Sequence, residues 1–135
     1  MMCAIEVTPT LATERLLLRG VVHADAERIA ELANDADVAS MTIAMPHPYT
    51  REEAESWLAR CRGMDWEREA HFVIEHHNFG MVGGLGFKPG PNGRPELGYW
   101  LGRAFWNRGY ASQTIIRVRT GPWRAWLQRS STSPV

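Results

Sequence analysis

Sulfur ligands and long apolar runs are scarce in this sequence of 135 residues. It has two cysteines, Cys3 and Cys61, so we expect no disulfide framework, and its five histidines lack the spacings typical of zinc sites. No apolar run approaches the ~20 residues of a transmembrane helix, so no membrane partner is expected. The N-terminal residues, MMCAIEVTPT, lack a basic region followed by an apolar stretch, which argues against a signal peptide. These absences predict a cytoplasmic protein without a metal site.

Acidic residues are absent after Glu96. All 15 of them lie in positions 1–96 beside nine basic residues, a net charge of −6, whereas the remainder carries six arginines and +6. Such asymmetry favours either an anionic partner or two parts of different origin. The six arginines follow no clear helical face, so nucleic acid is not the expected partner.

The periodicity of apolar residues predicts an α+β fold. Alternating or short apolar runs predict strands at 13–21, 71–75, 81–88 and 96–101. Spacings of three and four residues predict helices over 25–41 and from Thr50 to Cys61, the second opened by a capping box of Thr50 and Glu53. Two helices, an antiparallel meander and a later strand-to-helix crossover are typical of this class.

The most informative run is Glu96 to Ser112, ELGYWLGRAFWNRGYAS. An apolar strand leads through a turn containing Asn107 and Gly109 into the start of a helix. Free backbone N–H groups at such a helix start, together with the helix dipole, form a site for a phosphate or pyrophosphate.

Two other groups of residues allow a chemical and a structural interpretation. The glycines of Gly83-Gly84-Leu85-Gly86 resemble a dinucleotide fingerprint, but the third glycine is missing and no helix follows. We therefore interpret them as a strand with close backbone packing or a bulge. His71, His76 and His77 could include a general base or be surface residues of a strand edge, and Tyr49 and Trp57 fit the core or a pocket wall.

Three stretches resemble the GNAT N-acetyltransferase superfamily, and in particular its branch of ribosomal-protein N-terminal acetyltransferases. Thr13–Arg19 resembles the opening strand of that branch and Met81–Phe87 its third strand. The run from Glu96 to Ala111 resembles its fourth strand and acetyl-CoA loop, with Trp106 at the place of the general Gln or Arg, as is usual in this branch. The resemblance implies an N-acetyltransferase domain over 12–112, with a mixed, mostly antiparallel sheet flanked by helices.

The resemblance also implies acetyl-CoA as co-substrate, without a metal. Backbone N–H groups of Asn107 to Ser112 would hold the pyrophosphate, Gly109 would allow its close approach, and Arg108 would add charge. The strand 96–101 would separate from its neighbour near its end and leave backbone groups for the pantetheine arm. The implied coenzyme-binding residues are Trp100, Leu101, Trp106, Asn107, Arg108, Gly109, Tyr110, Ala111 and Ser112.

The implied reaction transfers acetyl from acetyl-CoA to a primary amine, on either a protein N-terminus or a small molecule. Glu96 is the candidate base, acting through water; it could equally be a solvated residue at the start of a strand. The segments 45–49 and 89–95 are expected to line the amine pocket.

After Ser112 the sequence departs from the family pattern. We interpret 113–135 as an atypical basic tail in place of a missing C-terminal half, with two helical turns stopped by Gly121-Pro122 and an end at 130–134 without regular structure. A broken reading frame near Ser112 is our hypothesis for this change. Strand 96–101 would then be an open sheet edge, prone to self-association. Two functions stay open: an active, truncated acetyltransferase, or a catalytically dead remnant that binds coenzyme A or a partner.

Overall fold

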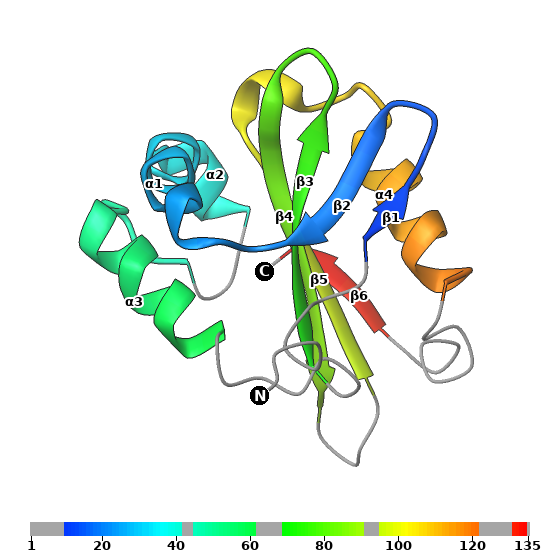
Figure 1. The fold of residues 1–135 in the computed structure, drawn as a ribbon. Helices are drawn as coiled ribbons and strands as arrows, with labels where there is room; N and C mark the ends of the chain where they lie inside the picture. Colours follow the sequence, from blue (N-terminus) through cyan, green and yellow to red (C-terminus); the bar gives the residue numbers. More distant parts are fainter. Residues whose placement is uncertain (1–9, 42–44, 62–68, 91–94, 122–130, 135) are drawn as a thin grey trace.

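The structure, a computed structural model, describes residues 10–41, 45–61, 69–90, 95–121 and 131–134. Within these residues the strands form one sheet in the order of the chain (Figure 1). Neighbours are antiparallel from the first strand to the fifth, and the sixth is parallel to the fifth. The strands are β1 Leu11–Ala12, β2 Leu16–Gly20, β3 Ala70–His76, β4 Gly80–Pro89, β5 Pro95–Leu101 and β6 Ser131–Pro134.

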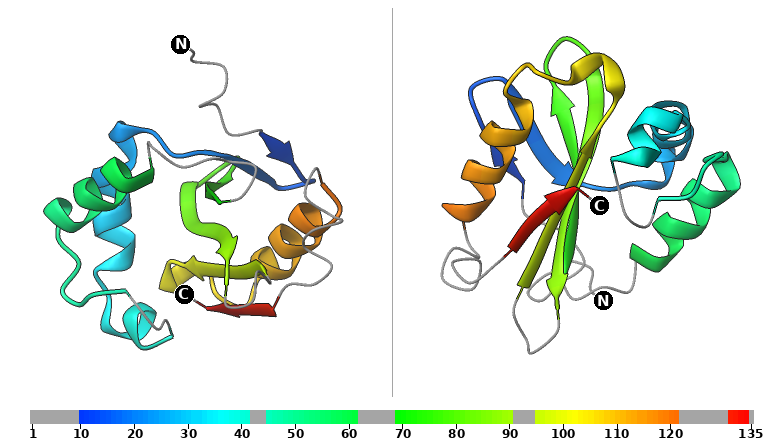
Figure 2. Two further views of the ribbon diagram at one scale, coloured as in Figure 1. Left: turned by 90° about the horizontal axis from the view of Figure 1, so that it is seen from below. Right: turned by 180° about the vertical axis from the view of Figure 1, so that it is seen from behind.

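Helices cover both faces of this sheet (Figures 1 and 2). One face carries α1 (Ala26–Ala33), α2 (Ala36–Ser40) and α3 (Arg51–Cys61); the other carries α4 (Tyr110–Arg119). Successive side chains of β3 point to opposite faces of the sheet and contribute to two hydrophobic cores. Phe72 and Ile74 pack with residues of α4 on one face, and Val73 packs with residues of α1 and α3 on the other. This confirms the predicted α+β fold with a mixed, mostly antiparallel sheet between helices.

The predicted strands and the helix after Thr50 are confirmed, and the helix expected over 25–41 is divided in two. Asn34 and Asp35 separate α1 from α2, and the Asp35 carboxylate accepts the backbone N–H of Asp37 as a cap. At the start of α3, the Thr50 hydroxyl accepts the backbone N–H of Glu53 at 3.2 Å, which is half of the predicted capping box.

Strand β6 corrects two predictions. Ser131–Pro134 was expected to lack regular structure, yet it pairs with β5 from Glu96 to Tyr99. Strand 96–101 is therefore no open edge over 96–99, because the extended segment takes up backbone groups that an edge would leave unpaired. Pairing with β6 ends at Tyr99, whereas Trp100 and Leu101 still pair with Gly84 and Gly83 of β4. The separation expected near the end of this strand is therefore absent toward β4.

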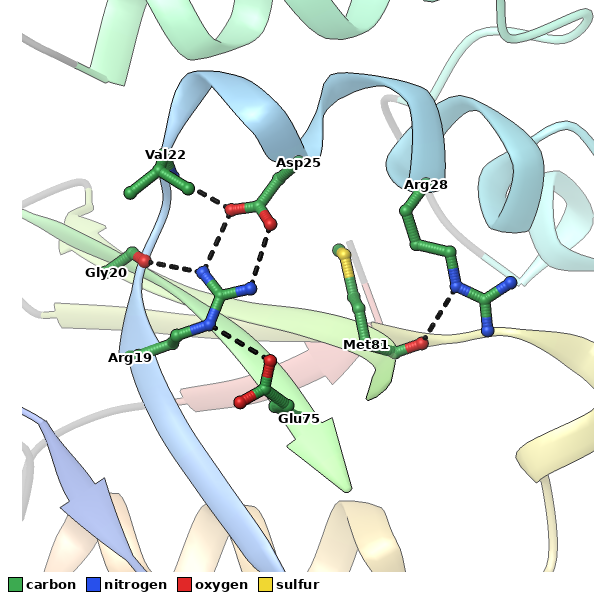
Figure 3. A network of polar contacts seen from close by, with 7 residues as sticks. All are labelled: Arg19, Gly20, Val22, Asp25, Arg28, Glu75 and Met81. Atoms are coloured by element: carbon green, nitrogen blue, oxygen red, sulfur yellow. Dashed lines mark hydrogen bonds and ion pairs between the residues drawn. The ribbon is translucent and has the colours of Figure 1, made fainter. Parts of the chain in front are cut away.

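A network of polar contacts joins β2 to the start of α1 and to β3 (Figure 3). The guanidinium of Arg19 donates to both carboxylate oxygens of Asp25, at 3.0 and 2.9 Å, and to Glu75 at 3.3 Å. The Asp25 carboxylate, which is buried, also accepts the backbone N–H of Val22 at 2.8 Å. Next to this network, Arg28 donates to the carbonyl of Met81 and ties α1 to β4. These contacts fix how the first helical layer sits on the sheet.

We expect Asp25→Ala to lower the free energy of unfolding by about 2–3 kcal/mol. The substitution removes a paired, buried carboxylate and leaves the Val22 N–H and part of Arg19 without partners. The matched control is Glu31→Ala, which breaks the exposed pair with Arg28 inside α1 and should cost less than about 0.5 kcal/mol. Urea unfolding of both variants measures the difference, and equal losses would contradict a structural role for the network.

No helix in the described ranges is long and apolar enough to cross a bilayer.

Candidate functional site

The segment between β5 and α4 is held against the sheet at its start. The backbone N–H of Gly102 donates to the Val82 carbonyl at 2.8 Å, and a single 3-10 turn, Arg103–Phe105, follows. Beyond it, Asn107 and Gly109 adopt positive φ angles of 63° and 80°. Positive φ costs little only for glycine and, to a lesser degree, asparagine, so these two residue types permit the sharp turn into α4.

This turn leaves the positive end of α4 open. The first helical bond runs from the N–H of Gln113 to the carbonyl of Gly109, and within the described part of the chain no side chain caps the helix. The N–H groups of Tyr110, Ala111 and Ser112 therefore have no intrahelical partner, and the helix dipole adds positive potential beside them. The arrangement suits an anion, as the sequence predicted.

A cavity of about 310 Å³ adjoins this helix start. Its walls come from α2, the end of β5, the turn and the first residues of α4. The lining residues are Val38, Met41, Tyr99, Trp100, Leu101, Trp106, Asn107, Gly109, Tyr110, Ala111 and Ser112.

All but one of the predicted coenzyme-binding residues line this first cavity. The exception is Arg108, whose guanidinium lies 5.9 Å from the centre of the Phe79 ring, while its carbonyl accepts a hydrogen bond from Arg15 at 3.3 Å. Trp106, which replaces the general Gln or Arg, donates its indole N–H to the carbonyl of Leu101 at 2.9 Å. That bond ties the turn to the end of β5.

A second, larger cavity of about 490 Å³ lies between α3 and the face of β3, β4 and β5. Trp57 and Glu53 of α3 line one side, and Met45, Pro46 and Tyr49 close another. Met45–Tyr49 was predicted to border the amine pocket, whereas residues 91–94 of the other predicted segment lie outside the described residues. Trp100 lines both cavities, and no other described residue does.

Glycines on β4 allow aromatic rings to lie close to the sheet at the second cavity. A methyl group at Gly84 would lie 2.7 Å from the indole nitrogen of Trp100, and one at Gly86 would lie 2.5 Å from Nδ1 of His71. The strand register places each ring directly opposite its glycine. This close packing explains the glycine run without a dinucleotide site.

His71 is a half-buried titratable group in the wall of this cavity. Its ring packs edge-on against Trp57, with centroids 5.2 Å apart, and Nε2 lies 3.4 Å from the Glu69 carboxylate. Burial lowers the pKa of His71 below its ordinary value, and Lys88 acts in the same direction, while the hydrogen bond and the charge of Glu69 oppose them. The neutral imidazole is therefore favoured at neutral pH.

We expect this depressed pKa to make folding stability fall in mild acid. The unfolded chain takes up a proton on His71 near pH 6.5, but the folded chain does so only at lower pH. The contribution to stability is therefore complete above pH 6.5 and is lost as pH falls toward the lower, folded pKa. His71→Gln should flatten urea-unfolding free energies measured between pH 7.5 and 5.5. His77→Gln, at an exposed position, serves as the control and should keep the wild-type slope.

The other predicted acid–base candidates fall in different surroundings. Glu96 is exposed and lines the second cavity, four residues before Trp100, or roughly 13 Å along the strand. His76 is buried, and its Nδ1 accepts the backbone N–H of Asn78 at 3.0 Å, which fits a structural role in the β3–β4 turn.

Cys61 is a free, half-buried thiol, and Cys3 lies outside the described residues. The described residues contain no group of three or more potential metal ligands.

Comparisons with known proteins point to one family. A family profile described as "Acetyltransferase (GNAT) domain" matches residues 15–123. An uncharacterized N-acetyltransferase, p20, from Bacillus licheniformis is 32% identical over 115 residues, which are 81% of this chain and 63% of that relative. The chain thus spans less than two thirds of the length of this curated relative.

Solved structures of low sequence identity share the fold. An acetyltransferase of the GNAT family from Bacillus anthracis matches with a TM-score of 0.72 and 22% identity, over 87% of this chain and 68% of its own. RimL, a ribosomal L7/L12 alpha-N-protein acetyltransferase in complex with coenzyme A, matches with a TM-score of 0.65 and 23% identity, over 85% and 66% of the two chains.

Proposed function

This chain belongs to the acetyltransferase (GNAT) family, and on that premise we propose that it transfers an acetyl group from acetyl-CoA to a primary amine. One observation carries the proposal: Trp100 lines two cavities, one suited to the coenzyme and one to the amine. The first borders an uncapped helix start, which suits a pyrophosphate, and the second is open to an organic acceptor.

The backbone N–H groups of Tyr110, Ala111 and Ser112, with the Asn107–Gly109 turn, are the proposed pyrophosphate site. The backbone of Trp100 and Leu101, beyond the end of the β5–β6 pairing, is the proposed contact of the pantetheine arm. The indole N–H of Trp106 donates to the Leu101 carbonyl, so it fixes the turn relative to the end of β5 and takes up that carbonyl itself.

In the proposed reaction a neutral amine nitrogen attacks the thioester carbonyl carbon. The new N–C bond forms while the C–S bond breaks, the amine loses a proton, and the coenzyme thiolate takes one up. Glu96 is the proposed proton acceptor. Its distance of roughly 13 Å along β5 from Trp100 requires that water carry the proton between the amine and the carboxylate.

The acceptor amine of the related enzyme RimL, by its name, is on a ribosomal protein. A protein N-terminus is accordingly one acceptor class for this chain, and a small amine is the other.

Calorimetric titration with acetyl-CoA, followed by a thiol-release assay with a panel of primary amines, tests the proposal. We expect one molecule of acetyl-CoA per chain and amine-dependent release of free coenzyme A. Absence of acetyl-CoA binding would overturn it. Binding without amine-dependent release would instead support the alternative, a coenzyme A-binding protein without transfer activity, which the distance of Glu96 from Trp100 favours.

A further inference from the structure

The second cavity is walled by aromatic rings of four residues. Tyr49 and Trp100 are buried, with 8% and 9% of their surface exposed, and Trp57 and His71 are half-buried. His71 and Trp100 lie low over the glycines of β4, so their rings, together with Trp57, face the space between the sheet and α3. The faces of such rings attract organic cations, and most strongly where water is excluded.

Carboxylates accompany these rings. Glu53, Glu69 and Glu96 line the cavity; Glu69 is next to His71, whereas Glu53 and Glu96 form no ion pair with any described residue. Two cations, Arg60 and Lys88, line it as well. Lys88 stands directly opposite Glu96 in the β4–β5 register, so these two charges offset each other, and the lining keeps a formal excess of one carboxylate.

Glu53 and Trp57 lie one turn apart on α3 and line the cavity together with Tyr49. Burial is the main cause that raises the pKa of Tyr49. The negative charge of Glu53 raises this pKa further, and the positive charge of Arg60 lowers it by less. A cation placed beside Tyr49 and Trp57 would therefore lie next to two aromatic side chains and to the carboxylate of Glu53.

The sheet meets this cavity with its face and not with an edge. Gly84, Gly86 and Gly98 are among the residues that line it, and each of them pairs with the neighbouring strand across the β4–β5 ladder. A peptide main chain could not add here as another strand, so recognition depends on rings and charges.

We infer that the acceptor held in the second cavity is a slender organic cation: a primary amine joined by a short aliphatic chain to a second ammonium group. The second ammonium lies against Tyr49 and Trp57 beside Glu53, and the chain leads the reacting amine toward Trp100. This inference rests on the proposed function for the fate of the reacting amine, but the binding of the cation does not depend on it.

Three probes of equal carbon number test the inference by calorimetry: 1,5-diaminopentane, pentylamine and 5-aminopentanoate. Each is titrated into the full chain alone and in the presence of coenzyme A. We expect the diamine to bind at least tenfold more tightly than pentylamine, and aminopentanoate to bind most weakly. Equal affinity for the diamine and pentylamine, or preference for aminopentanoate, would overturn the inference.

Glu53→Gln locates the second ammonium, and Glu52→Gln on the same helix is its matched control. Glu53 lines the cavity, whereas the exposed Glu52 does not. We expect Glu53→Gln to lower the affinity for the diamine about fivefold or more and to leave that for pentylamine unchanged, with no effect of Glu52→Gln. An unchanged diamine affinity in Glu53→Gln would place the cation elsewhere and refute the assignment. Failure of the chain to bind acetyl-CoA would overturn the proposed function. The titrations without coenzyme A would still test the inferred cation site, because they do not require the coenzyme.

Discussion

Gly109→Ala should reduce the affinity for acetyl-CoA by about 10- to 100-fold. Gly109 is the N-cap of α4 at φ 80°, immediately before the three N–H groups proposed to hold the pyrophosphate. A side chain at this φ costs roughly 1–2 kcal/mol, and the turn can relieve that strain only by moving those N–H groups. Hydrogen bonds to a charged group contribute about 1.5–3 kcal/mol each, so the loss of one or two accounts for the expected range.

Gly80→Ala separates the strain from the loss of binding. Gly80 lies in the β3–β4 turn with a φ of 69°, and a methyl group there would meet no atom within 4 Å. Both variants should lose a similar amount of unfolding free energy, about 1 kcal/mol, but Gly80→Ala should keep the wild-type affinity for acetyl-CoA. Calorimetry and urea unfolding of the pair provide the measurement. Wild-type affinity in Gly109→Ala would show that the start of α4 does not hold the coenzyme.

Local patterns in the sequence were sufficient for most of the fold. The capping residue Thr50, the apolar spacing of α3 and the alternation along β3 and β4 each specify one element through nearest neighbours. The division of the helix over 25–41 was missed because a tertiary contact supports it: the Asn34 side chain accepts the backbone N–H of Tyr49, 15 residues away, at 3.0 Å. The spacing of apolar residues along the sequence cannot indicate a contact between residues so far apart.

Strand β6 was missed for a related reason. Ser131–Pro134 has one residue with a strand preference, Thr132, and ends in a proline, so the pairing depends on the free backbone groups of β5. The family resemblance concerned the sequence before Ser112, whereas the profile match extends to residue 123 and α4 continues to Arg119.

The two cavities differed in how far the sequence revealed them. The first is built mainly from one continuous run, Trp100 to Ser112, so a motif could describe almost all of its lining. The second combines Tyr49, Trp57, His71 and the glycines of β4, which are far apart in the sequence and carry no common spacing. In the sequence, the glycine run indicated close packing but not what packs there, and Tyr49 and Trp57 fitted either the core or a pocket wall. Only the family resemblance placed the segments 45–49 and 89–95 at an amine pocket.

Gly83→Ala should be the most destabilising of the substitutions considered, with a loss of more than about 3 kcal/mol. Gly83 faces Leu101 in the β4–β5 register, and a methyl group there would collide with the Trp100 carbonyl oxygen and lie 2.9 Å from Cα of Leu101. Overpacking usually costs about 1–3 kcal/mol because side chains can move aside. Here the obstacle is the backbone of Trp100 and Leu101, so β4 and β5 must separate at this point. Trp100, which lines both cavities, would move with β5.

Gly84→Ala is the matched comparison, because its nearest obstacle is the indole of Trp100, a side chain that can rotate. We expect Gly83→Ala to lower the melting temperature by about 10 °C or more, and Gly84→Ala to lower it by less than half as much. Thermal unfolding followed by tryptophan fluorescence gives both values. Hydrogen exchange should show lost protection in β4 and β5 for Gly83→Ala alone. Equal melting temperatures would mean that the ends of β4 and β5 can part without loss, and that Trp100 is not held in place by the strand pairing.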